Sequence, residues 1–202
     1  MSTASRPTVA VAFHSGYGHT AVLAEAVARG AAEGGAEVVT VPVDTITEEQ
    51  WDQLDAADAI VFGSPTYMGT ASGAFHAFAE ATSKRWFTSA WKDKLAAGFT
   101  NSGSKSGDKL HTLQFFSVLA AQHGMNWINL GLHPGWNTSE ASENDLNRLG
   151  IFLGAGAQTH TDHGPDEVHK ADIATAEHLG RRVAEQTAVV LAGRTALAAV
   201  TV

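Results

Sequence analysis

The segment SGYGHT, Ser15 to Thr20, carries more hydrogen-bonding groups than a connecting turn needs. Gly16 and Gly18 can adopt backbone angles that other residues avoid, so the amides around them can point into one concavity. Ser15 and Thr20 add hydroxyls, His19 adds a ring nitrogen, and a helix predicted from Thr20 adds the positive end of its dipole. The segment therefore predicts an anion site, with an ordinary strand-to-helix turn as the alternative.

Three kinds of phosphate ligand have to be weighed for this segment. A Walker turn ends in Gly-Lys-Ser/Thr, and the missing lysine argues against a nucleoside triphosphate. Gly16, Gly18 and Ala21 fit the dinucleotide pattern G-x-G-x-x-G/A, and Asp44 stands near the end of the next predicted strand, where an acid could hold a ribose. A terminal phosphate has more oxygens to satisfy than a pyrophosphate, which favours hydroxyl donors. Two later loops decide between these ligands.

The two loops follow predicted strands and are also rich in small polar residues: GSPTYMGTASG (63–73) and TNSGSKSGDK (100–109). In the first, Tyr67 and Met68 could lie against one side of a flat ring, while Pro65 stiffens the turn. The second is too polar for a core, and a flexible loop is its alternative interpretation. A flat heteroaromatic group that carries one phosphate accounts for all three loops, which predicts flavin mononucleotide, FMN.

The elements that must position these loops alternate along the chain. Apolar runs predict strands at 8–14, 36–43, 59–63, 94–100 and 126–131. Helical spacing predicts helices at 20–33, 50–57, 72–82, 110–123 and 165–192, with an irregular stretch at 132–164. This alternation predicts an α/β fold with a mainly parallel sheet and helices on both faces. Such sheets bind ligands at the carboxyl ends of their strands, where the three loops are expected.

Composition narrows the class of protein. The 202 residues fit one domain, 1–202, with 1–7 as a flexible arm. A net charge of −8 and a pI near 5.6 argue against nucleic acid and anionic membrane partners. The absence of cysteine excludes disulfides, thiolate catalysis and iron–sulfur clusters. With no secretory signal and a tail too short to span a bilayer, we expect a cytoplasmic protein.

Taken together, four stretches resemble the WrbA-type NAD(P)H:quinone oxidoreductases of the flavodoxin-like superfamily. They are SGYGHT, FGSPTYMGTASG, KLAAGFTNSGS and LAAQHGMNWINLG, in family order over about Val9 to Gly131. The resemblance implies a flavodoxin-like, doubly wound sheet of five parallel strands in the order 2-1-3-4-5. It also implies non-covalently bound FMN, NAD(P)H as co-substrate and a quinone as electron acceptor. A homodimer or homotetramer is typical of the family.

The resemblance also assigns roles to residues. His123 matches a family histidine near the flavin and is the candidate catalytic residue and a cofactor contact. Tyr17 matches an aromatic residue beside the nicotinamide, and Trp86 a tryptophan of the acceptor pocket. Active sites shared between subunits are expected if Trp86 lies on an outward loop. The implied FMN ligands are Ser15, Gly16, Tyr17, Gly18, His19, Thr20, Pro65, Thr66, Tyr67, Met68, Gly69, Asn101, Ser102, Gly103, Ser104, Lys105, Ser106 and His123.

Two rival functions remain open. A flavodoxin-type carrier would share the fold and FMN but would pass single electrons to a protein partner without an NAD(P)H site. The second rival is a non-redox role as a metal-binding or regulatory module, because His160, Asp162, His163 and His169 cluster in HTDHGPDEVH. Local clusters are expected among ten histidines. We therefore expect no metal site and interpret this segment as a solvated loop, folded over the flavin.

Overall fold

The computed structural model describes residues 6–200, so most of the predicted arm 1–7 lies outside the described residues. The strands are β1 Thr8–Phe13, β2 Glu37–Pro42, β3 Ala59–Tyr67, β4 Thr70–Ala71, β5 Leu95–Ser102, β6 Asn126–Trp127 and β7 Ala155–Gln158. The helices are α1 His19–Glu33, α2 Glu48–Ala56, α3 Gly73–Ala81, α4 Ser83–Phe87, α5 Lys109–Gln122 and α6 Lys170–Val200, with single 3-10 turns η1 Val43–Thr45 and η2 Pro165–Glu167.

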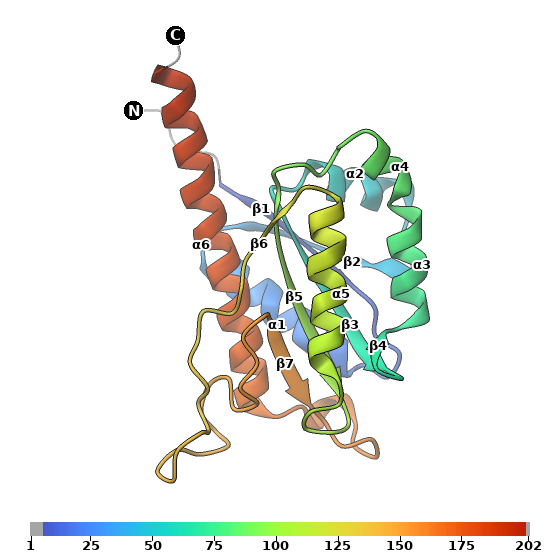
Figure 1. Ribbon diagram of the computed structural model, residues 1–202, viewed down its shortest axis with the longest axis vertical. Helices are drawn as coiled ribbons and strands as arrows, with labels where there is room; N and C mark the ends of the chain where they lie inside the picture. The colour runs from blue at the N-terminus through green and yellow to red at the C-terminus, as the bar shows by residue number, and fades with distance from the viewer. Residues whose placement is uncertain (1–5, 201–202) are drawn as a thin grey trace.

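Five strands form a parallel sheet in the order β2-β1-β3-β5-β6 (Figure 1), and β4 pairs antiparallel with β3. Counted by the predicted strands, this is the order 2-1-3-4-5, which confirms the flavodoxin-like fold. The chain moves from β1 to one neighbour and then crosses to the other at β3. The strand order therefore reverses between β1 and β3, and a ligand crevice is expected at their carboxyl ends.

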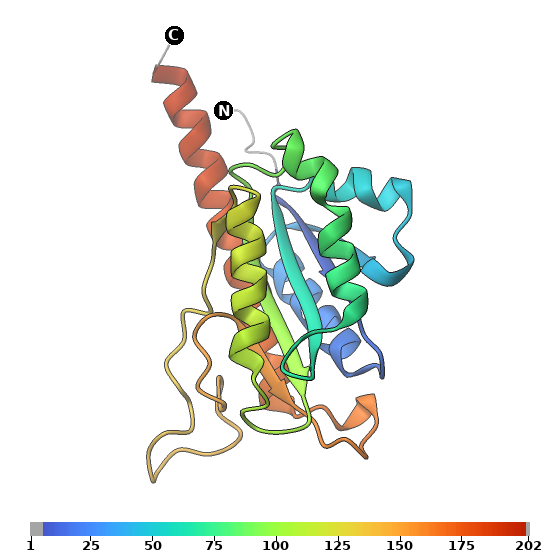
Figure 2. The ribbon, with the colours of Figure 1, turned by 45° about the vertical axis from the view of Figure 1, so that its right-hand side comes forward.

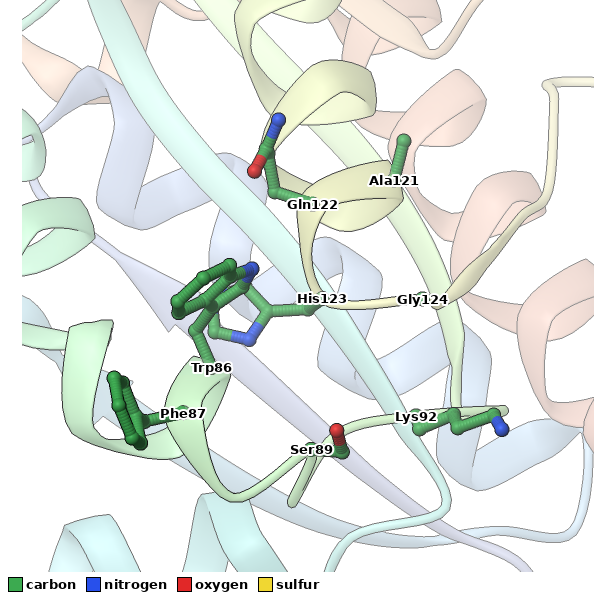
Figure 3. A pocket seen from close by; sticks show the side chains of 8 residues that line it. All are labelled: Trp86, Phe87, Ser89, Lys92, Ala121, Gln122, His123 and Gly124. Carbon is green, nitrogen blue, oxygen red and sulfur yellow. The ribbon is translucent and has the colours of Figure 1, made fainter.

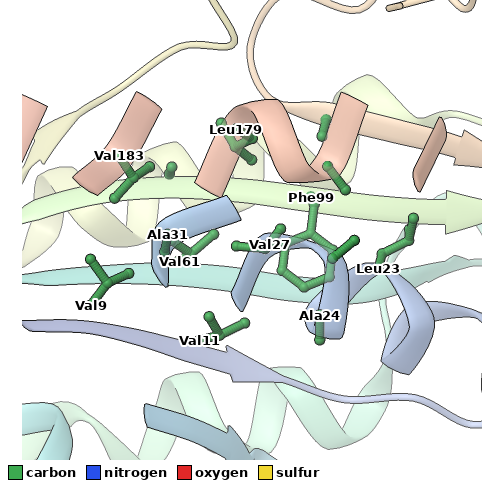
Figure 4. Packing of buried hydrophobic residues seen from close by; sticks show 14 of the residues in the cluster. Val9, Val11, Leu23, Ala24, Val27, Ala31, Val61, Phe99, Leu179 and Val183 are labelled. Atoms are coloured by element: carbon green, nitrogen blue, oxygen red, sulfur yellow. The ribbon is translucent and has the colours of Figure 1, made fainter. Parts of the chain in front are cut away.

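Alternate residues of each central strand enter the two halves of the core, because side chains of a strand point to opposite faces. Val9 and Val11 of β1 pack on the side of α1 and α6, where Leu23, Val27 and Leu179 meet them (Figure 4). The intervening alanines of β1 face α2, α3 and α5. Both faces of the sheet are covered by helices, as Figure 2 shows. Burial on both faces explains why these strands read as continuous apolar runs.

Two glycines let α1 and α6 lie against each other. A Cβ atom built on Gly30 would overlap the carbonyl oxygen of Glu177, and one on Gly180 would overlap that of Val27. The two backbones therefore touch directly at this crossing. This contact joins the first helix to the last and closes the core on that side of the sheet.

The fifth strand position differs from the prediction of one strand at 126–131. β6 pairs only with the start of β5, at Leu95 and Ala96. β7, inside the stretch predicted to be irregular, pairs with the other end of β5, from Phe99 to Ser102. The edge strand is thus made of two short pieces, separated by residues 128–154. The sequence hides this because only four residues, AGAQ, form the second piece.

The final helix was also predicted with the wrong bounds. Pro165 begins the 3-10 turn η2, and α6 starts only at Lys170. α6 is 31 residues long, and its last buried residue is Thr187, so the remainder extends past the sheet (Figure 1). Among residues 6–200 it is the one helix long and apolar enough to cross a membrane by length and composition. Its first half packs in the core, so composition alone does not define its role.

Candidate functional site

A hollow of about 700 Å3 lies at the carboxyl ends of β1, β3 and β5. We call it the carboxyl-end pocket. It joins all three predicted loops to a fourth segment that begins after β7. Its lining residues are Ser15, Tyr17, His19, Thr20, Pro65, Thr66, Tyr67, Met68, Asn101, Ser102, Gly103, Thr159, Thr161 and His163. The strand order brings the loops together here, as the reversal between β1 and β3 requires.

The first loop wraps the amino end of α1. Gly18 precedes the helix with φ at 90°, a conformation that favours glycine. The Ser15 hydroxyl accepts a hydrogen bond from the Ala21 amide at 3.1 Å, which ties the loop to the first turn of the helix. Within residues 6–200, the amides of 16–20 donate no hydrogen bond. These free donors at a helix amino terminus suit an anion such as phosphate.

The second loop is a tight hairpin between β3 and β4. Met68 and Gly69 both have positive φ values, 48° and 86°, and Tyr67 pairs with Thr70 across the turn. The ring of Tyr67 meets that of Tyr17 edge-on, with centroids 6.2 Å apart. Burial raises the pKa of Tyr67, and the neighbouring Tyr17 adds to the shift. Two aromatic rings therefore form one wall of the pocket and can border a flat ligand.

Thr66 lines the pocket, and its hydroxyl is engaged by two other threonines. Its hydroxyl lies 2.8 Å from the hydroxyl of Thr100 and 2.8 Å from that of Thr112. All three side chains are buried. The trio joins β3, β5 and α5 at the pocket, so the Thr66 side chain supports the pocket floor.

The third loop lines the pocket with fewer residues than predicted. Asn101 accepts a hydrogen bond from the Thr159 hydroxyl at 3.0 Å, which fixes its amide at the pocket edge. A Cβ on Gly103 would lie 2.6 Å from the Thr161 Cγ2, so a larger residue there would require the Thr161 side chain to move. Ser104, Lys105 and Ser106 do not line the pocket. The Lys105 ammonium instead lies 5.2 Å from the ring centre of Trp136.

The segment after β7 closes the pocket beside the first loop. The ring of His19 is hydrogen-bonded to the carbonyl oxygen of His163 at 2.9 Å. Pro165 packs against Gly18. The sequence predicts that this segment folds over the ligand, but it does not indicate that Thr159, Thr161 and His163 line the pocket. The reason is that β7, which positions them, is not predicted from the sequence. Among residues 6–200, no group of three metal-binding side chains comes together.

His123 and Trp86 do not line the carboxyl-end pocket. They line a separate hollow of about 460 Å3 with Phe87 and Lys92, which we call the amino-end pocket (Figure 3). Helix α5 begins at the carboxyl end of the sheet and spans 14 residues, about 20 Å, so His123 at its far end cannot reach the carboxyl-end pocket of its own chain. Within one chain, the structure therefore does not bring His123 together with the other predicted flavin contacts.

His123 is nonetheless an unusual side chain. It is buried, its Nε2 lies 2.8 Å from the Thr82 hydroxyl, and its ring centre lies 4.6 Å from that of Trp91. Its Nδ1 has no hydrogen-bond partner within residues 6–200. Burial lowers the pKa of the His123 ring, which favours the neutral form. Trp86 is half exposed and Phe87 largely exposed on the outer side of α4.

The donor set of the carboxyl-end pocket fits FMN. Free amides and hydroxyls at the start of α1 suit a phosphate dianion, and the two tyrosine rings suit a planar ring system. A Cβ on Gly16 would lie 2.6 Å from the Tyr67 hydroxyl, so a side chain there would displace the Tyr67 ring from the first loop. The volume lies within the range of cofactor sites. Fold and site together define a flavodoxin-like α/β protein with a mononucleotide site at the switch point.

Comparison with known proteins agrees with this class. Residues 11–132 match the NADPH-dependent FMN reductase family, and the chain belongs to that family. Flavodoxin FldP of Pseudomonas aeruginosa is 44% identical over 177 residues, which cover 86% of this chain and 93% of that protein. An NAD(P)H dehydrogenase (quinone) of Archaeoglobus fulgidus is 34% identical, covering 88% and 95%. A crystal structure of a flavodoxin, WrbA-like protein from Agrobacterium tumefaciens aligns with a TM-score of 0.71 at 41% identity, covering 90% and 97%.

Proposed function

We propose that the protein is an FMN-dependent oxidoreductase that transfers electrons from NAD(P)H to a quinone or a similar small acceptor. The single observation that carries this proposal is the convergence of the predicted phosphate loop and the two tyrosines on one pocket at the switch point. FMN, when bound, supplies the redox chemistry by accepting a hydride from the nicotinamide and passing the electrons on. The protein's own residues bind and orient the ligands. The name of the Archaeoglobus fulgidus relative supports the quinone.

Different residues of the carboxyl-end pocket bind different parts of the ligands. The amides and hydroxyls of 15–20 hold the phosphate, with the positive end of α1 beside it. Tyr67 and the hairpin border the isoalloxazine, and the backbone of 101–103 lies at its polar edge. Tyr17, which is 76% exposed, is free to lie beside a nicotinamide on the open side. No nucleophile or acid–base pair is required for hydride transfer.

Roles for His123 and Trp86 at the flavin require a second copy of the chain. Both lie about one helix length from the carboxyl-end pocket of their own chain, yet Trp86 faces outward and His123 Nδ1 lacks a partner within residues 6–200. A homodimer or homotetramer could bring the amino-end pocket of one chain to the flavin of another. We therefore propose a homo-oligomer of this single-domain chain, located in the cytoplasm, with His123 beside the flavin and Trp86 beside the acceptor.

A flavodoxin-type electron carrier is the second candidate, because the relative with 44% identity is named a flavodoxin. The carrier would hold the same FMN in the same pocket. It differs in having no site for NAD(P)H, so it predicts no rapid bleaching of the bound flavin by a nicotinamide.

The test is an absorbance spectrum of the purified protein, followed by stopped-flow mixing with NADH and NADPH, with and without benzoquinone. The oxidoreductase predicts bound FMN, rapid loss of its visible absorbance on mixing with a nicotinamide and recovery on adding benzoquinone. Bound FMN that neither nicotinamide reduces rapidly would establish the carrier. A protein that binds no FMN would remove both candidates.

A further inference from the structure

Lys109 is a fully buried lysine next to the carboxyl-end pocket. Its side chain is 1% exposed at the first turn of α5. The ammonium donates hydrogen bonds to the Ser102 hydroxyl at 2.7 Å, the Ser104 carbonyl at 2.6 Å and the Lys105 carbonyl at 3.1 Å. An ammonium has three donors, and all three are used by these neutral oxygens. Lys109 therefore anchors the third loop by hydrogen bonds, and none of these bonded groups carries a negative charge.

The buried charge around Lys109 does not balance. Within residues 6–200, no carboxylate forms an ion pair with Lys109; the neighbouring Asp172 is bound by Arg148 through two hydrogen bonds of 2.8 and 2.7 Å. Burial lowers the pKa of Lys109 to about 8, with Asp172 opposing and Arg148 adding to the shift. Two cations and one anion leave one positive charge in the buried cluster. A buried cation without a counter-charge costs free energy, which an anionic ligand nearby would offset.

The bonds behind the loop also fix which way its peptides face. The carbonyl of Gly103 accepts a hydrogen bond from the Gln158 side chain at 2.9 Å, and those of Ser104 and Lys105 accept from the buried ammonium. In a trans peptide the following N–H points the opposite way, so the amides of Ser104, Lys105 and Ser106 face outward. Within residues 6–200 these three amides donate no hydrogen bond. Ser104, Lys105 and Ser106 do not themselves line the carboxyl-end pocket, so these bonds act on the pocket through Ser102 and Gly103, which do.

We propose that Lys109 is a positioning residue for FMN that makes the protein bind reduced FMN more tightly than oxidised FMN. It fixes Ser102, which lines the pocket, through the 2.7 Å hydrogen bond and supplies the unbalanced positive charge beside the third loop. Reduction of a flavin by hydride increases the negative charge on this side of the ring, and charge near the ring nitrogens tunes its potential. The inference rests on the proposed function, because it requires FMN in the carboxyl-end pocket.

Two substitutions separate charge from position. Lys109→Gln keeps a polar donor behind the loop and removes the charge, whereas Lys109→Met removes both. Lys94→Met is the matched control: the Lys94 ammonium also donates to backbone carbonyls, those of Asp55 and Ala57, but at the amino end of the sheet. Affinity for oxidised FMN is measured by fluorescence titration, and the midpoint potential of bound FMN by equilibration with a reference dye. Unfolding midpoints are recorded for all three variants.

We expect Lys109→Gln to weaken binding of reduced FMN about tenfold more than binding of oxidised FMN, which lowers the two-electron potential by about 30 mV. Lys109→Met should show the same shift and weaker binding of both forms. Lys94→Met should lose stability and keep the wild-type potential. Equal loss of affinity for both forms in Lys109→Gln would mean that Lys109 is merely structural and would overturn the inference.

The wild-type protein provides a measurement that needs no variant. Tighter binding of reduced FMN places the potential of bound FMN above that of free FMN, and a value at or below it contradicts the inference even if neither Lys109 variant folds. If the wild-type protein binds FMN and is reduced by NAD(P)H, but the variants keep the wild-type potential, the inference about Lys109 is wrong and the proposed function stands. A wild-type protein without FMN removes the proposed function as well.

Discussion

Pro165 packs directly on Gly18, so that a Cβ at Gly18 would lie 2.5 Å from the Pro165 Cγ. The two residues are 147 positions apart in the sequence. Gly18 belongs to the loop that precedes α1, and Pro165 begins the turn that leads toward α6. The contact therefore ties the first loop, where we propose that the phosphate binds, to the segment that closes the pocket, and it depends on glycine both for space and for its φ of 90°.

Gly18→Ala should lower FMN affinity at least about tenfold, because a methyl group there strains the loop backbone and pushes Pro165 away. Gly35→Ala is the control, since Gly35 has nearly the same φ, 91°, with nothing within 4 Å of a new Cβ. We expect both variants to lose about 1 kcal/mol of stability from backbone strain. Only Gly18→Ala should weaken FMN binding in a fluorescence titration; equal affinities in both variants would contradict this role.

Thr66→Val should reduce the free energy of unfolding by about 1–3 kcal/mol, because it leaves the hydroxyls of Thr100 and Thr112 without their shared partner in a buried site. Thr88→Val, which removes an exposed hydroxyl, should change it by less than about 0.5 kcal/mol. Urea unfolding measures both. A Thr66→Val protein as stable as the wild type would show that the trio does not support the pocket floor.

Gly30→Ala should destabilise the protein by several kcal/mol or prevent folding, because the added methyl overlaps the Glu177 carbonyl where α1 crosses α6. Gly193→Ala is the counterpart in the exposed part of α6, where nothing lies within 4 Å. There, alanine should raise the helix stability by up to about 1 kcal/mol. We expect the unfolding temperature to fall in Gly30→Ala and to rise in Gly193→Ala. If both variants shift it in the same direction, the role given to the helix contact is wrong.

Stability should fall as the pH decreases below about 6.5, the ordinary pKa of histidine. Burial lowers the pKa of His123 in the folded protein, so the unfolded chain binds a proton at His123 before the folded one does. The stabilisation is therefore complete above pH 6.5 and is lost as the pH falls toward the folded pKa. His123→Gln should show a shallower decrease of unfolding temperature between pH 7 and 5. The prediction fails if the two slopes coincide.

Much of this arrangement is determined by local sequence. Continuous apolar runs specify strands buried on both faces, as in AVAF of β1, and helical spacing specifies α1, α3 and α5 within two residues of their observed bounds. The donors and glycines of SGYGHT indicate an anion site by their chemistry alone. The order of the strands then follows from the resemblance to flavodoxin-like proteins.

Only the tertiary structure decided the rest, because it depends on contacts between distant segments. β7 has four residues and gains its strand character from pairing with β5, so the sequence could not reveal it or the pocket residues Thr159 and Thr161 that it positions. The length of α5 separates His123 from the pocket to which its motif assigned it. Lys109 looked like the end of a polar loop, and its burial follows from packing between α5, β7 and the third loop. Local patterns specify which residues can do chemistry, whereas the path of the chain determines which of them meet.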